Sequence, residues 1–131
     1  MKKYLVVSAM SACVLILGSD AFAEVDYAKE IQPIFDNSCV DCHKAPYEKN
    51  GRMRKPKAGL RMDTYEFVMQ GSEDGAIIKP GNPEESSAYK LTTLPRDHED
   101  AMPPEDKTEP LTDAQKKLLY NWIKEGAKNS K

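Results

Sequence analysis

The sequence predicts a small all-α domain, and three observations lead to this fold class. Helix-capping signals precede apolar residues at helical spacing at several points along the chain. No run of alternating apolar and polar residues indicates a β-strand. The chain has 131 residues, and its first segment has the features of an export signal, so the remainder is the size of one domain.

Residues 1–23 are predicted to be a cleaved secretory signal peptide. Lysines at positions 2 and 3 precede an apolar run that ends at Leu17, and Ala21-Phe22-Ala23 has the A-x-A pattern of a cleavage site. The apolar run is shorter than the roughly 20 residues of a membrane-spanning helix. We therefore expect periplasmic or other export, a mature domain of residues 24–131, and no stable membrane insertion after cleavage.

The first predicted helix covers residues 26–38. Ile31, Ile34 and Phe35 recur there at i, i+3 and i+4 spacing, which places them on one face of a helix. Pro33 lies inside this segment, and proline is tolerated in the first turn of a helix but not in its interior. The helix is therefore expected either to start at Pro33 or to be kinked there.

Two further helices are predicted after a loop. Residues 44–58 are polar and contain glycine and proline, which is typical of a loop. Residues 63–66 (D-T-Y-E) resemble a capping box, and Gly71 would end the helix that they open. Residues 82–85 (N-P-E-E) combine an N-cap asparagine, a proline in the first helical position and a glutamate in the third. The helix that they open is expected to run to about Thr93.

The last predicted helix follows an irregular segment. Residues 94–110 hold four of the chain's nine prolines and many charges, so they are not expected to form regular structure. Residues 112–115 (T-D-A-Q) form another capping box, and Gly126 would end the helix. One apolar stripe lies between these signals and consists of Leu118, Leu119, Trp122 and Ile123.

The composition limits both the function and the core. The formal net charge is −2 at pH 7, which argues against nucleic-acid binding because such domains show a strong basic excess. The mature chain has few large apolar residues, so a core of protein alone would be thin and a domain of this size marginally stable. A buried macrocycle would supply the missing apolar mass.

The segment C-V-D-C-H, residues 39–43, contains two of the chain's three cysteines and one of its two histidines. C-x-x-C-H is the spacing of covalent haem attachment. On a helical turn, residues three and four apart share a face. The thiols of Cys39 and Cys42 could then add to the two vinyl groups of a haem, while the imidazole of His43 reaches the iron as proximal ligand. The other ring nitrogen of His43 should donate to a backbone carbonyl.

Three other interpretations of this motif explain less. A structural disulfide is sterically awkward at this spacing and does not account for His43. A thioredoxin-like dithiol expects a βαβ setting, which the sequence lacks. A structural zinc site needs four ligands, and His98 is the only other histidine or cysteine of the mature chain. One covalently attached haem c is therefore the favoured interpretation.

The second axial ligand of the iron has several candidates. Met/His ligation is the electron-transfer arrangement of haem c and raises the reduction potential. Met53 is close in sequence to the attachment site, while Met62 and Met69 are more readily explained by packing. Met102 lies in an irregular A-M-P-P segment whose prolines restrict the backbone, so the sequence favours Met102. Ligation by His98 and an open iron site remain alternatives.

On these motifs, the chain resembles class I c-type cytochromes and, more narrowly, the planctomycete-type cytochrome c domain. The resemblance covers nearly all of residues 25–128. It rests on an ordered set of segments: I-Q-P-I-F-D-N-S-C-V-D-C-H, G-L-R-M-D-T, I-I-K-P-G-N-P-E-E-S-S-A-Y-K-L, A-M-P-P and L-T-D-A-Q-K-K-L-L-Y-N-W-I-K-E-G-A. It implies an all-helical fold of short helices around a single haem. Cys39 and Cys42 would attach the haem, and His43 and Met102 would be its proximal and distal ligands. The basic stretch 44–57 departs from the family pattern.

These observations predict an exported monohaem c-type cytochrome that carries single electrons between redox protein partners and is not an enzyme. Residues 44–57 are strongly basic, and the charged residues of 97–109 are mostly acidic. Attraction between such patches and patches of opposite charge on a partner speeds the encounter of the two proteins. Two alternatives remain. One is the haem subunit of a larger dehydrogenase or oxidase complex, and the other is a haem enzyme or ligand sensor with an open iron site.

Overall fold

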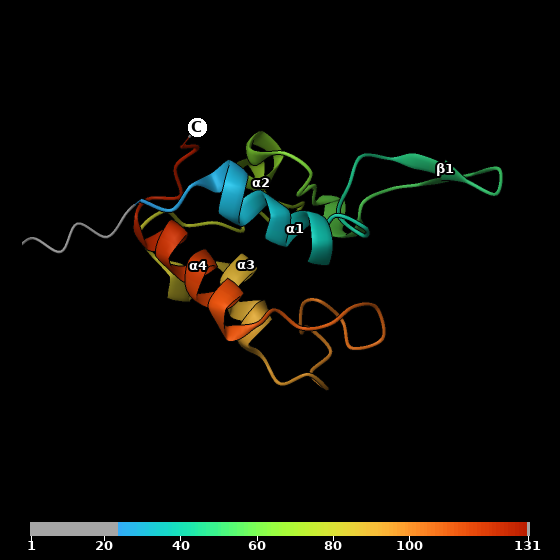
Figure 1. The fold of residues 1–131 in the computed structure, drawn as a ribbon. Coiled ribbons are helices and arrows are strands. Elements are labelled where there is room, and N and C mark those ends of the chain that lie inside the picture. The colour runs from blue at the N-terminus through green and yellow to red at the C-terminus, as the bar shows by residue number, and fades with distance from the viewer. Residues whose placement is uncertain (1–23, 131) are drawn as a thin grey trace, which may run out of the picture.

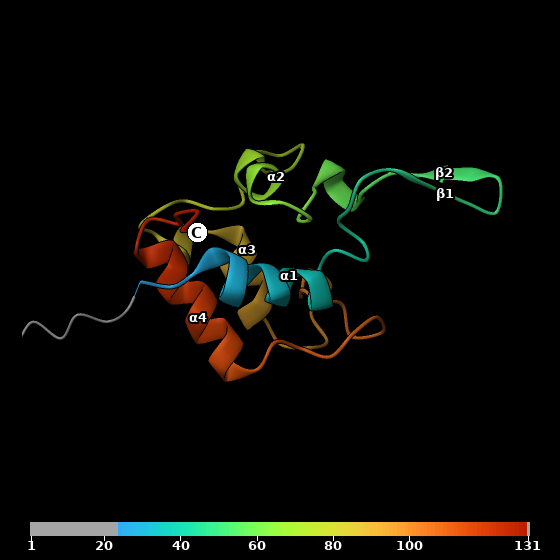
Figure 2. The ribbon, with the colours of Figure 1, turned by 45° about the horizontal axis from the view of Figure 1, so that its top comes forward.

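The computed structural model describes residues 24–130, so the predicted signal peptide lies outside the described residues. Most of the regular secondary structure of the described chain is helical (Figures 1 and 2). Its α-helices are α1 (Gln32–Ser38), α2 (Tyr65–Gln70), α3 (Ser87–Lys90) and α4 (Asp113–Lys124), and its strands are β1 (Tyr47–Lys49) and β2 (Arg52–Arg54). A π-helical turn (Tyr27–Ile31) precedes α1, and 3-10 turns cover Lys57–Gly59, Pro83–Glu85 and Leu91–Thr93.

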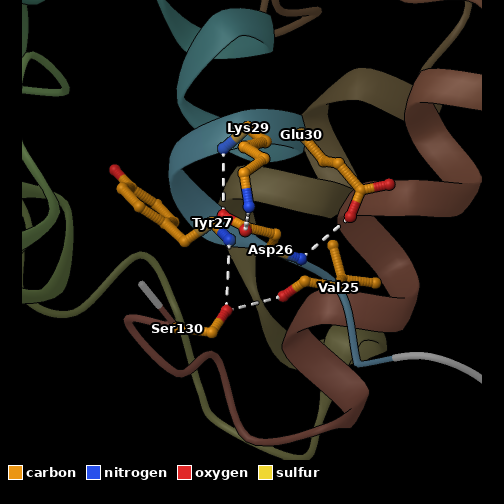
Figure 3. Close-up of polar contacts among 6 residues, drawn as sticks. All are labelled: Val25, Asp26, Tyr27, Lys29, Glu30 and Ser130. Atoms are coloured by element: carbon orange, nitrogen blue, oxygen red, sulfur yellow. Dashed lines mark hydrogen bonds and ion pairs between the residues drawn. The ribbon is translucent and has the colours of Figure 1, made fainter.

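The chain enters the fold through a capped helical turn (Figure 3). The carboxylate of Asp26 accepts a hydrogen bond from Lys29 N at 3.1 Å, and Asp26 N donates to Glu30 Oε2 at 2.8 Å. These bonds satisfy backbone donors that a helix N-terminus leaves unpaired. The helix predicted over 26–38 is confirmed, and Pro33 lies in the first turn of its α-helical part, α1.

The two ends of the described chain meet at this turn. The hydroxyl of Ser130 donates to Val25 O at 3.0 Å and accepts from Tyr27 N at 3.3 Å, as Figure 3 shows. The C-terminal residues are therefore attached to the start of the fold.

The core lies between the N-terminal helical segment and α4. Four aromatic rings cluster there in tilted and edge-to-face contacts, with centroids 5.0 to 6.5 Å apart: Tyr27, Phe35, Tyr65 and Trp122. Such pairs contribute about 0.5–1.5 kcal/mol each beyond the burial of their area. Trp122 is fully buried, and its Nε1–H donates to Lys128 O at 2.8 Å. The predicted apolar stripe of α4 therefore packs on the core.

Residues 44–58 are not a plain loop, so the all-α prediction is wrong at this point. β1 and β2 form an antiparallel hairpin whose paired residues are Tyr47–Arg54, Glu48–Met53 and Lys49–Arg52. Asn50 and Gly51 form the turn with φ of 54° and 69°, the positive values that tight hairpin turns favour. Four of the six strand residues are charged, all six are exposed, and the strands show no apolar alternation, which is why the pattern did not indicate strands.

The helix predicted over 82–93 is divided into three short turns. Asn82 makes no side-chain capping bond, and Ser86 has extended backbone angles (φ −85°, ψ 114°). The buried hydroxyl of Ser86 donates to Asn82 O at 2.9 Å and accepts from Lys79 N at 2.8 Å. Serine interrupts helices where its hydroxyl finds local backbone partners of this kind.

The remaining elements agree closely with the predictions. Thr64 caps α2, one residue later than the D-T-Y-E pattern implies, and Gly71 ends it. Thr112 and Gln115 form the full capping box of α4, and Gly126 follows that helix at φ 105°. Residues 94–110 contain no helix or strand, as predicted. None of the helices within residues 24–130 has the length and apolar character needed to cross a membrane.

Candidate haem site

A hydrogen-bonded turn directly after α1 carries the C-V-D-C-H motif. The N–H groups of Cys42 and His43 both donate to Cys39 O, at 3.2 and 3.0 Å. The three residues therefore follow one helical turn. Both cysteines are free thiols rather than a disulfide. Cys39 packs against the core, and its burial raises the pKa of the thiol to about 12, so this thiol is neutral at pH 7.

His43 is held by the chain that returns from the hairpin. Its Nδ1 lies 3.1 Å from Lys57 O, and since a carbonyl can only accept, the ring donates Nδ1–H. Lys57 N donates to Cys42 O at 3.2 Å, and Met62 N donates to His43 O at 2.8 Å. Desolvation lowers the pKa of His43, although the bond to Lys57 O opposes this. A neutral ring with its proton on Nδ1 leaves Nε2 free to bind a metal.

A mostly apolar cavity of about 320 Å³ lies beside this turn. It is bounded by the end of α1, residues 58–62, α3, α4 and the irregular segment 94–110, which we call the Met102 segment. Its apolar lining includes Phe35, Leu60, Ile77, Ala88, Leu91 and Leu119. Cys39, His43 and Met102 also line it, whereas Cys42 does not. Protein interiors contain few voids larger than a water molecule, and this volume lies within the range of ligand pockets. The chain therefore folds around a space suited to an apolar group.

The lining of the cavity distinguishes between the predicted candidates for the second axial ligand. Met53 is 64% exposed on β2, and His98 is exposed in the irregular segment. Met69 packs against the core, but it does not line the cavity, and neither do Met53 and His98. Met62 and Met102 do line it. The choice among the predicted candidates is thereby reduced to these two.

Met62 and Met102 reach the cavity from different segments. Because Met62 N donates to His43 O, Met62 is a direct neighbour of the histidine. Met102 N instead donates to Leu91 O at 2.9 Å, which attaches its segment to the turn that follows α3. Met102 therefore approaches from a wall separate from that of His43.

Arg96 supports the Met102 segment. Its guanidinium donates to Pro103 O at 2.7 Å, to Thr108 O at 2.8 Å and to Glu105 O at 3.2 Å. A planar guanidinium with five N–H donors can bridge several carbonyls at once. The sequence analysis did not single out Arg96, although it is one of two basic residues among the acidic side chains of this segment.

The role of Lys57 was also not predicted, because any residue can present a backbone carbonyl and the pattern therefore contains no signal for it.

Within the described part of the chain, no group of three or more His, Cys, Asp or Glu side chains is placed to hold a metal ion. The zinc interpretation would need such a group. The structure thus brings Cys39, His43 and Met102 to one apolar cavity, with Cys42 on the adjoining turn.

A protein-family model described as Planctomycete cytochrome C matches residues 39–106. The match covers just over half of the chain and includes the hairpin, most of the Met102 segment and all four predicted site residues. No curated protein and no solved structure matches the chain.

Proposed function

The chain belongs to the planctomycete cytochrome C family, and we propose that it is an exported monohaem cytochrome c that carries single electrons between redox proteins. The family indicates a haem-binding, electron-transfer role and covalently bound haem c. The proposal adds one haem, ligation by His43 and Met102, cleavage of residues 1–23 and function as the mature domain 24–131. The observation that supports it best is that both proposed ligands line one apolar cavity.

The side chains around the cavity fit a haem. The apolar lining suits the macrocycle and excludes water from it. Cys39 and Cys42 lie on the same turn as His43, so we assign them the two thioether bonds. The bond from His43 Nδ1 to Lys57 O leaves Nε2 for the iron.

Haem iron, when bound, supplies a one-electron couple between its ferric and ferrous states. The residues of the chain set the conditions for that couple. The carbonyl of Lys57 fixes the tautomer and orientation of His43 and makes Nε2 more basic. A thioether from Met102 would favour the ferrous state and so raise the reduction potential. With both axial positions filled, the protein would transfer electrons without making or breaking a substrate bond.

We assign the distal position to Met102 rather than Met62. Two axial ligands must approach an iron from opposite faces of the macrocycle. Met62 is bonded to the carbonyl of His43 itself, whereas Met102 is attached to Leu91. The position of Met62 suits packing against the macrocycle on the histidine side, which a flexible thioether does well.

Periplasmic expression followed by intact mass and visible spectra tests the proposal. We expect the mass of residues 24–131 plus one haem, a far-red charge-transfer band in the ferric protein, and no ready binding of carbon monoxide to the ferrous protein. Met102→Ala should abolish the band and admit carbon monoxide, while the matched variant Met62→Leu should keep both properties of the wild type.

Each outcome against expectation has a distinct meaning. A colourless product with the mass of the bare polypeptide refutes haem attachment. A band that survives Met102→Ala refutes the ligand assignment alone. Ready binding of carbon monoxide to the wild type favours a haem enzyme or ligand sensor, and stable co-purification with a larger dehydrogenase or oxidase favours a subunit role.

A further inference from the structure

The hairpin of β1 and β2 projects away from the helical body in both views (Figures 1 and 2). It carries both of the large apolar side chains that are exposed in the described chain, Tyr47 at 38% and Met53 at 64% exposure. An isolated two-stranded hairpin is only marginally stable in water, and this one contributes no residue to the buried core. Its side chains are therefore free to serve a purpose other than packing.

The register sorts these side chains onto two faces. Residues paired across an antiparallel ladder point to the same face, as do residues two apart along one strand. The pairing Tyr47–Arg54 and Lys49–Arg52 therefore places these four residues on one face, which we call the cationic face. The opposite face carries Glu48 and Met53. The hairpin's one acidic residue is thus separated from its three cations.

In the described chain, the three cations of the strands have no carboxylate partner. None of Lys49, Arg52 and Arg54 takes part in any ion pair found among residues 24–130. Lys49 and Arg52 lie directly opposite each other, and like charges in that position destabilise a strand pair. Lys44 adds a further cation, with Nζ 4.6 Å from the centroid of the Tyr47 ring, but unlike the other three it is paired with a carboxylate, that of Asp41 at 3.2 Å. An anionic surface placed on this face would relieve the repulsion.

The base of the hairpin is bonded to the candidate haem site. Lys57, which follows β2, accepts from His43 Nδ1 at 3.1 Å and donates to Cys42 O at 3.2 Å. The strands that carry the cationic face are therefore joined through Lys57 to the residues that we assign to the haem.

We propose that the cationic face is a docking surface for an acidic surface of another redox protein. Its composition of arginine and tyrosine, with methionine on the reverse face, is typical of protein interfaces. A small, charge-steered contact also suits a partner that must dissociate after electron transfer. The identity of the partner as a redox protein rests on the proposed function, whereas the docking itself does not.

A protein fits this surface better than a lipid bilayer or a nucleic acid. The turn at the tip consists of Asn50 and Gly51, which present no apolar side chain for insertion into a membrane. Tyr47 and Met53 lie on opposite faces, so they cannot enter one apolar layer together. The net charge of −2 opposes wrapping by a polyanion such as nucleic acid.

The test titrates the holo protein with a poly-L-glutamate peptide at low ionic strength and follows backbone amide NMR shifts. The hairpin variant is Lys49→Gln, Arg52→Gln, Arg54→Gln. The control Lys90→Gln, Lys117→Gln, Lys124→Gln removes the same charge from exposed positions on α3 and α4. We expect shifts centred on residues 44–57 and about tenfold weaker binding by the hairpin variant, with the control close to wild type.

Three results would overturn the inference. The first is that both variants bind the peptide equally less tightly than the wild type. The second is that the protein binds phosphatidylglycerol vesicles more tightly than the peptide. The third is that the protein self-associates in a salt-dependent way, with the hairpin on the acidic residues 97–109 of a second copy. The visible spectrum of each sample reports the haem independently. A normal haem spectrum with unselective peptide binding therefore refutes the docking surface alone, and a colourless sample refutes the proposed function alone.

Discussion

Replacing Arg96 by alanine should loosen the Met102 segment without unfolding the protein. Two of the three bonds from the guanidinium are partly buried, those to Pro103 O and Thr108 O, and the bond to Glu105 O is exposed. A charged hydrogen bond contributes about 1.5–3 kcal/mol when well buried. Because water can replace the donor here, we assign about 1 kcal/mol to each partly buried bond and little to the third. The free energy of opening the segment should therefore fall by about 2 kcal/mol, which raises the equilibrium constant for opening about 30-fold.

Imidazole binding to the ferric protein measures this opening, because imidazole can bind the iron only when Met102 has left it. The apparent affinity of a ligand scales with the population of the competent state. We therefore expect the apparent Kd of imidazole to fall about 30-fold in Arg96→Ala. Arg96→Lys should be intermediate, since one ammonium group cannot span three carbonyls.

Ser86→Ala is the matched control for a general loss of stability. It removes partly buried hydrogen bonds to Lys79 and Asn82, so it should lower the free energy of unfolding but leave the Kd of imidazole near the wild-type value. If Arg96→Ala lowers the free energy of unfolding and does not change the Kd, Arg96 supports the fold in general and the reasoning is refuted. A wild-type protein without Met–haem ligation would instead refute the ligand assignment.

Three further predictions follow from the same structure. Without haem attachment, in the Cys39→Ser, Cys42→Ser variant, the cavity of about 320 Å³ would destabilise the fold by about 8 kcal/mol at about 24 cal/mol per Å³. That is comparable with the whole stability of a small domain, so circular dichroism should show no cooperative thermal transition, and observing one would count against a haem-dependent fold. The hydrogen bond from Arg61 lowers the pKa of Asp63 below its ordinary value of 3.8. This pair therefore contributes stability above about pH 4 that is lost as the pH falls through the lowered folded pKa. Asp63→Asn should lose less stability than wild type in urea unfolding between about pH 5 and pH 2, and equal losses would show that the pair does not contribute. Finally, electron exchange with the physiological partner should slow as ionic strength rises. Stopped-flow rates that are indifferent to salt would contradict electrostatic steering while leaving the haem assignment intact.

Local sequence signals predicted the elements whose stabilising bonds are also local. The capping box of Thr112 and Gln115 and the apolar stripe that follows it define α4 within the element itself. The same holds for the turn that carries Cys39 and His43, because its hydrogen bonds join residues three and four apart. The haem interpretation of this motif could therefore be made before any packing was known.

Elements that depend on distant or competing partners were not predicted. The hydroxyl of Ser86 interrupts a helix whose start signal is strong, because it finds carbonyl and amide partners at Asn82 and Lys79. The hairpin has a suitable Asn50-Gly51 turn but no apolar alternation in its strands. In both cases the pattern of side-chain types was ambiguous and the three-dimensional surroundings decided.

The sequence by itself determined the family, the haem-attachment motif and the short list of methionines, because these follow from residue types at fixed spacing. Only the tertiary structure decided which of them share a cavity, that Lys57 accepts from His43, and that Arg96 supports the Met102 segment. The physical reason is that backbone carbonyls look alike in every sequence. A side chain's partner therefore becomes visible only when residues far apart in the chain are brought within hydrogen-bond distance.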